Sequence, residues 1–395
     1  MQVSQRSRHA GQGGPVPACA ALDLYDGDLG AAPFAAYARL RSQAPVHHMP
    51  ARDVWVLSRY EDVVKAASDS ARFTSRETNG LERRSLKVLV GTDGAEHARL
   101  RRFAARALSP TRLAALAVRV DAIVAARVGA FADAGGGDVV AALAEPVACS
   151  AFADLLGLDP DGLTARRNGR GLAPDPRRAW RAFFVEAISR RRARPAADLI
   201  SALLEEAPDG DRLSDEELVG MLGLLLAAGA DTTRDLLAGL LAEHAVRPSA
   251  WERLLDAPAL AGSAVEEALR YTSPIQGMFR TATADAEVAG VTIPAGSRVM
   301  LLFGSADRDE RRWGDAARFD VARYAGGLAT GGAHIAFGSG PHACPGAHLA
   351  RRIARVALGE LLRRRARLVA AGDRQYGRNP STISLRSFPL TVRQE

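Results

Sequence analysis

Cysteine is scarce in this chain. Only three occur in 395 residues, Cys19, Cys149 and Cys344, and no two of them form a Cys-x-x-Cys pair. An odd number of widely spaced thiols excludes a disulfide scaffold and argues against a structural zinc site. The fold therefore has to rest on its hydrophobic core, and we expect a reducing compartment.

Long apolar runs are also missing. The longest, Met221–Ala230, is too short to cross a bilayer. Residues 1–20 are polar and rich in glycine and proline, without the charged-then-apolar pattern of a signal peptide. These observations predict a cytoplasmic protein with no membrane contact and a disordered leader at residues 1–20.

Lysine is nearly absent, since Lys65 and Lys87 are the only two. The formal net charge of +7 therefore comes almost entirely from arginine, and the arginines are scattered along the chain. A nucleic-acid-binding protein would gather its basic residues on one face. The sequence thus favours no nucleic-acid partner, although a basic surface can steer an acidic protein partner.

Hydrophobic residues make up 47% of the chain, enough for a large core. Alanine, leucine and arginine recur at helical spacing from about residue 95 to 269, and a last helix is expected at about 347–368. Short strands are expected at 45–48, 54–57 and 382–392, with a hairpin at 288–300 that turns at Pro294–Gly296. The pattern predicts a mainly α fold with a small β part, in one domain over residues 21–395.

The segment Phe337–Gly346 carries one thiol in a stiff loop. Glycines permit unusual backbone conformations, prolines stiffen the turn, and an amphipathic helix follows Cys344 directly. Negative charge is favoured near a helix N-terminus, and nearby amides can tune a thiolate. A buried structural cysteine beside an ordinary turn is the plain alternative.

The order Phe337, Gly340, His342, Cys344 and Gly346, followed by Leu-Ala-Arg at 349–351, resembles the haem-thiolate loop of the cytochrome P450 family. The resemblance implies that Cys344 ligates the iron of a haem b, and that Phe337, His342 and Gly346 also belong to the haem site. A thiolate ligand favours O–O bond cleavage at haem iron.

The segment Leu224–Thr233 is similar to the central helix of that family. In that reading Ala228 or Gly229 leaves room for dioxygen. Asp231 and Thr232 form an acid–alcohol pair that delivers protons through ordered water. The alternative is a buried helix whose threonine bonds to its own preceding turn.

Two further sets of residues match the family. Glu267 and Arg270 stand three apart on one helix and, with Arg323, resemble its buried structural ion cluster. The remaining matches are basic residues that would hold the haem propionates, which need cationic partners when buried. They are His97, Arg101, Arg280 and His342.

The resemblance covers about residue 25 to the C-terminus and is to the soluble bacterial type. It implies a single triangular domain. The chain is too short to carry a fused reductase as well, so ferredoxin and its reductase, or a flavodoxin, would supply electrons. It also implies a monomeric monooxygenase that inserts one atom of O2 into an organic small molecule, as in natural-product tailoring.

The pocket and the lid follow from the same resemblance. Only about forty residues separate Leu158 from Asp198, and Gly169–Pro174 suggests a reduced first lid helix, hence a more open pocket. The mostly apolar positions expected to line the pocket suggest a substrate with substantial apolar area. They are Leu86–Val90, Leu224, Ala227, Ala228, Thr232, Gln276, Gly277, Met278, Phe279 and Ile383.

Two other functions share these motifs. An oxidative coupling enzyme would join two atoms without inserting oxygen. A non-catalytic haem-binding sensor would tolerate the loss of Thr232, whereas a monooxygenase would release peroxide.

Overall fold

The computed structural model describes residues 22–26, 33–76, 78–79, 82–83, 88–167, 175–377 and 381–393. The predicted leader at residues 1–20 lies outside these ranges. The helices, in chain order, are α1 Phe34–Gln43, α2 Tyr60–Ser68, α3 Gly94–Ala107, α4 Pro110–Asp133, α5 Glu145–Leu156, α6 Pro160–Arg167, α7 Pro176–Ala193, α8 Leu199–Leu204, α9 Asp215–Ala245, α10 Pro248–Asp256, α11 Ala261–Thr272, α12 Phe303–Ala306, α13 Leu328–Gly331 and α14 Ala347–Arg363. Single turns of other helix types are η2 Leu89–Gly91, η3 Val139–Ala144, η4 Pro258–Leu260 and η5 Gly340–His342.

The strands form a minor part of the fold, so the prediction of a mainly α protein is confirmed. They are β1 Val46–Met49, β2 Val54–Leu57, β3 Phe73–Thr74, β4 Thr78–Asn79, β5 Glu82–Arg83, β6 Gly136–Asp138, β7 Met278–Ala282, β8 Ala286–Val288, β9 Val291–Ile293, β10 Arg298–Leu301, β11 Arg367–Ala370, β12 Gln375–Tyr376, β13 Leu385–Ser387 and β14 Pro389–Arg393. The largest sheet has the order β1-β2-β10-β7-β3, with β2 and β10 parallel and the other pairs antiparallel.

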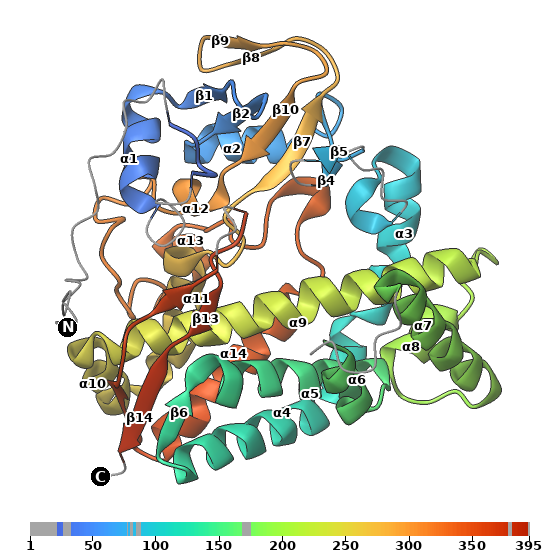
Figure 1. Ribbon diagram of the computed structural model, residues 1–395, viewed down its shortest axis with the longest axis vertical. Coiled ribbons are helices and arrows are strands. Elements are labelled where there is room, and N and C mark those ends of the chain that lie inside the picture. The colour runs from blue at the N-terminus through green and yellow to red at the C-terminus, as the bar shows by residue number, and fades with distance from the viewer. Residues whose placement is uncertain are drawn as a thin grey trace, which may run out of the picture.

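The long helix α9 runs through the middle of the molecule, with the five-stranded sheet on one side and a layer of helices on the other (Figure 1). Its start is well defined, because Ser214 and Glu217 form a reciprocal capping box. Helices α4, α5, α11 and α14 belong to the same core, and α5, α11 and α14 pack directly on α9. The middle of α9 therefore lies between the sheet and the helical layer and is held in place by the helices packed on it.

One segment, Val139–Leu156, is long and apolar enough to cross a membrane, but 72% of it is buried inside the protein. It comprises η3 and α5, which pack against α4 and α9. This is the packing of a core helix.

Three boundaries differ from the sequence-based expectation. The last helix ends at Arg363 rather than 368, because Arg365 adopts a left-handed conformation and the chain then pairs as β11 with β14. The β8–β9 hairpin turns at Ala289–Gly290, and Pro294–Gly296 forms a second turn before β10. The glycine-rich break before Asp138 forms β6.

A buried ion cluster joins α11 to the segment that leads to the cysteine loop. Glu267 and Arg270 are both 0% exposed, and the arginine Nε and the carboxylate Oε2 are 2.8 Å apart. Arg323 Nε donates to the same Oε2 at 3.0 Å, and the Asp320 amide donates to Oε1 at 2.8 Å. Arg270 also donates to the Ala316 carbonyl. Fully satisfied hydrogen bonding is what makes charges tolerable at this depth.

We predict that Glu267→Gln lowers the free energy of unfolding by about 3–5 kcal/mol, because it leaves two arginines without their buried counter-charge. Equilibrium urea denaturation measures the effect. The matched control is Glu61→Gln, which removes an exposed pair to Lys65 at 3.9 Å and should cost no more than about 1 kcal/mol. Equal losses in the two variants would contradict this role for the cluster.

Candidate haem site

The cysteine loop is closed by its own backbone. The Cys344 amide donates to the Phe337 carbonyl at 2.8 Å, and Gly338 and Gly340 take left-handed conformations with φ of 73° and 69°. At Gly340 a β-carbon would lie 2.6 Å from the Cα of Ser68 at the end of α2. Glycine is required here both by the backbone conformation and by the close approach to α2.

The thiol of Cys344 ends this loop three residues before α14. The residue is exposed, yet enough protein surrounds the sulfur that burial raises the pKa of the thiol. The amides of Gly346 and Ala347 donate to the sulfur, and the charges of Arg101 and Arg351 also favour the thiolate. The sulfur therefore faces an opening on one side and hydrogen-bond donors on the other, as a metal-binding thiolate requires.

Cys344 does not share its site with other metal-binding groups. Within the part of the chain that the structure describes, no group of three or more histidine, cysteine or acidic side chains is placed to hold a metal. Cys149 is buried in α5 and donates to Glu145, and Cys19 lies outside the described ranges. A cofactor that needs only one protein ligand fits this arrangement, and a closed metal site does not.

Two of the predicted propionate partners come from α3. The ring of His97 is buried, its Nε2 has no hydrogen-bond partner, and burial lowers its pKa to about 4. Arg101, one turn later, is half-buried, and burial lowers its pKa as well. Buried polar groups in folded proteins are normally satisfied, so this imidazole nitrogen is available to bind a ligand.

A third partner comes from the sheet. Arg280 on β7 is buried, donates to the Phe279 carbonyl, and has its pKa lowered by burial to about 10. Among the residues that the structure describes, no carboxylate lies within 4 Å of the guanidinium of Arg101 or Arg280. Arg101 on α3 and Arg280 on β7 are thus basic groups without an acidic partner in the described part of the chain, and they fit the two carboxylates of a haem.

His342 is placed differently from the other three. Its ring lies 4.2 Å from that of His97, but its Nε2 is 2.7 Å from Asp93 Oδ1 and 3.1 Å from Ser75 Oγ. Burial acts against ionisation of Asp93, but hydrogen bonds from His342, Thr74 and Ser75 hold its pKa at about 2. Only Nδ1 of His342 is left for a propionate, a restriction that the sequence pattern did not indicate.

The side of α9 that carries Ala227 and Ala228 is exposed, although the helix is central to the fold. Exposed surface in such a helix requires an opening beside it. Gly229 is not part of that opening, because a β-carbon there would collide with Phe152 of α5. The expectation that Gly229 makes room for dioxygen is therefore corrected, and Ala228 is the small residue at the opening.

The acid–alcohol pair follows on the same helix. Thr232 Oγ1 donates to the Ala228 carbonyl at 2.6 Å, the local bond by which threonine competes with the helical ladder. Asp231 is half-buried, and its Oδ1 lies 3.4 Å from Arg234 Nη1. Both candidate proton-transfer groups therefore lie within one turn of the exposed alanines.

Several expected pocket residues do not face this opening. Gln276 is buried and donates to the carbonyls of Thr272 and Ser273 at the end of α11. Phe279 packs in a core cluster with α1 and β2, because alternate side chains of β7 point to opposite faces. The expectation that these two line the pocket is corrected.

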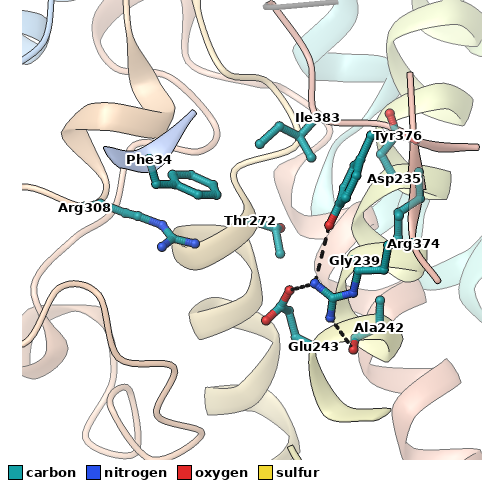
Figure 2. A pocket seen from close by; sticks show the side chains of 11 residues that line it. Phe34, Asp235, Gly239, Ala242, Glu243, Thr272, Arg308, Arg374, Tyr376 and Ile383 are labelled. Carbon is teal, nitrogen blue, oxygen red and sulfur yellow. Dashed lines mark hydrogen bonds and ion pairs between the residues drawn. The ribbon is translucent and has the colours of Figure 1, made fainter. Parts of the chain in front are cut away.

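The other expected positions are distributed around the fold. Gly277 lies against Met300 and the Leu301 carbonyl with no space for a side chain, and Met278 packs on the core beside the sheet. Leu224 is partly buried against the main core, and Ile383 lines a separate small cavity (Figure 2).

The segment predicted as 86–90 is only partly described. Residues 86 and 87 lie outside the described ranges, and Leu89 is buried in the core. In the lid, α6 has 8 residues and α7 has 18. The suggested reduced helix at Gly169–Pro174 lies outside the described residues.

Known proteins resemble this chain over most of its length. The family model described as Cytochrome P450 matches residues 259–373. Cytochrome P450 130 of Mycobacterium tuberculosis is 35% identical over 390 residues, covering 90% of this chain and 95% of the relative. Cytochrome P450 monooxygenase PikC of Streptomyces venezuelae is 33% identical over 392 residues, covering 93% and 92%.

A solved structure, cytochrome P450 CYP109Q5 from Chondromyces apiculatus, superposes with a TM-score of 0.86 at 29% identity, covering 96% of this chain and 100% of that chain. The fold and site define a haem-thiolate oxidoreductase. The chain belongs to the cytochrome P450 family, whose members are monooxygenases with a cysteine-ligated haem b.

We predict that Gly340→Ala destabilises the protein more than Gly290→Ala. Both glycines have a positive φ, so both variants incur about 1–2 kcal/mol of backbone strain. Only position 340 has backbone atoms in the path of the new methyl group, which adds about 1–3 kcal/mol, whereas nothing lies within 4 Å at position 290. Thermal unfolding and the rate of haem loss measure both effects, and equal behaviour of the two variants would contradict the packing argument.

Proposed function

We propose that the protein inserts one atom of O2 into an organic small molecule, with Cys344 as the ligand of its haem iron. The observation that carries this proposal is the exposed Cys344 thiol, which receives hydrogen bonds from two backbone amides at the start of α14. A bound haem b would supply oxygen activation, favoured by electron donation from the thiolate.

The remaining residues of the haem site divide by chemistry. Arg101 and Arg280 would neutralise the propionates, and His97 and His342 would contact them as hydrogen-bonding groups, His342 through Nδ1. Phe337 is partly buried beneath the Arg351 guanidinium, which lies 4.5 Å from its ring centre, and so forms an apolar wall of the loop. Gly346 would contribute its backbone amide to the sulfur.

Proton delivery would come from α9. Thr232 presents a hydroxyl group that both donates and accepts, and Asp231 presents a carboxylate one residue earlier. Ordered water between them and the opening would move protons toward the site where oxygen binds. The side chains of Ala227 and Ala228 are small enough to leave that space unfilled.

The proposal extends to substrate and partners. The apolar Ala227 and Ala228 beside the opening fit an organic substrate with large apolar area, as in natural-product tailoring. Electrons would come from a ferredoxin with its reductase, or from a flavodoxin, and the net charge of +7 would speed the encounter with an acidic donor. We place this reaction in the cytoplasm and the protein as a monomer.

We predict that the reduced carbon monoxide complex of the wild-type protein shows the strongly red-shifted Soret band of a thiolate-ligated haem. Cys344→Ser should lose this band, because a serine hydroxyl does not replace the thiolate. Cys149→Ser is the matched control and should keep it, since that thiol is buried in α5. A wild-type protein that takes up no haem, or a Cys344→Ser variant that keeps the band, would exclude the assignment.

Insertion of oxygen has a separate test. Small aromatics, terpenoids, macrolides and cyclic peptides are screened for a spectral shift on binding, and a binding compound is then turned over under isotopically labelled dioxygen. We expect mass spectrometry to find one labelled oxygen atom in the product. A product formed by coupling with no label would instead establish oxidative coupling. If Thr232→Ala forms as much product per electron consumed as wild type, proton delivery by this residue is contradicted.

A further inference from the structure

Arg234 stands two residues after Thr232 and lies half-buried inside the protein. Its guanidinium reaches four side chains on three elements of the fold. Within α9, Nη2 lies 2.8 Å from Asp235 Oδ1, and Nη1 lies 3.4 Å from Asp231 Oδ1. From other parts of the chain, Nη2 donates to Ser384 Oγ at 3.0 Å, and Nη1 lies 3.4 Å from Glu145 Oε2 of α5.

The charges in this cluster are unequal. Among the described residues, three carboxylates, those of Asp231, Asp235 and Glu145, lie within hydrogen-bonding or ion-pair distance of the Arg234 guanidinium. Burial opposes the charge of Arg234, but the neighbouring carboxylates outweigh it and raise its pKa. The arginine is therefore a permanent cation that holds three mutually repelling acids together.

The guanidinium is fixed mainly by the partners other than Asp231. Asp235 is buried, and its Oδ1 also accepts a hydrogen bond from Ser384 Oγ at 2.9 Å. Burial raises the pKa of Asp235, and the contacts with Arg234 and Ser384 act in the opposite direction. Asp235 also borders a cavity of about 40 Å³, large enough for a few water molecules, which is lined by Tyr376 and Arg374 among others (Figure 2).

We propose that Arg234 is a positioning residue for Asp231. Held by Asp235, Ser384 and Glu145, its guanidinium directs the Asp231 carboxylate along the α9 face shared with Thr232. This inference rests on the proposed function, since it concerns the group that would deliver protons. The same contacts also join α9 to the segment that carries Ile383 and Ser384.

The test compares Arg234→Gln with Arg234→Lys in the reduced carbon monoxide complex. The infrared stretch of bound carbon monoxide reports the polar groups beside that ligand without any turnover. Asp231→Asn identifies the component of the band that depends on Asp231. We expect Arg234→Gln to shift or broaden that component, because the Asp231 carboxylate then loses the guanidinium that orients it.

Arg234→Lys retains the charge without the forked geometry. We expect its carbon monoxide band to be closer to that of wild type than the band of Arg234→Gln. In turnover with a binding substrate, Arg234→Gln should release several-fold more peroxide per electron pair than wild type. The KM for the substrate should change less than the rate of product formation.

Arg374→Gln is the matched control. Arg374 is similarly buried, with a side chain 22% exposed against 20% for Arg234, and it also joins the C-terminal segment to α9, through Glu243 and the Ala242 carbonyl (Figure 2). A purely structural role would make both variants behave alike. The proposal is overturned if Arg374→Gln changes the Asp231-dependent component equally, if Arg234→Gln has the wild-type band, or if no component of the wild-type band depends on Asp231. None of these results would alter the thiolate band or the oxygen label.

Discussion

A sulfur atom with backbone amides on one side and open space on the other is the constraint on which this structure depends. The thiolate form of Cys344 must be stable in a setting where burial favours the neutral thiol. Backbone amides and the start of α14 supply the compensating polarity, and they can do so only if the loop bends tightly at Gly338 and Gly340. The tight bend of the loop is therefore what makes a stable thiolate possible.

The surrounding fold keeps that loop in place with charges buried away from water. The Glu267–Arg270 pair and Arg323 hold the segment that precedes the loop. On the other side, Glu266 binds both His334 and Arg351 of α14, and these contacts outweigh burial and hold its pKa at about 2. A rigid scaffold of this kind leaves the basic groups of α3 and β7 facing the site without carboxylates of their own.

The two sides of the opening use charge in different ways. Near the sulfur, His97, Arg101 and Arg280 are basic residues, and no described carboxylate lies within 4 Å of either arginine. Around Arg234 of α9, by contrast, the described residues place the carboxylates of Asp231, Asp235 and Glu145 of α5. The first arrangement leaves room for an anionic group, and the second fixes a guanidinium among acids.

Much of this protein could be read from short segments of its sequence. The order of residues around Cys344, the acid–alcohol pair and the Glu-x-x-Arg pair are local patterns, and the mainly helical composition follows from local periodicity. The strands β6 and β11 were missed because their pairing with β14 joins residues far apart in the chain. What only the tertiary structure decided is how side chains are shared across elements. Asp93 binds one ring nitrogen of His342, Phe152 fills the space beside Gly229, and Ser384 and Glu145 contact Arg234. Each of these contacts joins segments far apart in the chain. Local sequence patterns therefore do not reveal them, because they depend on how those segments pack.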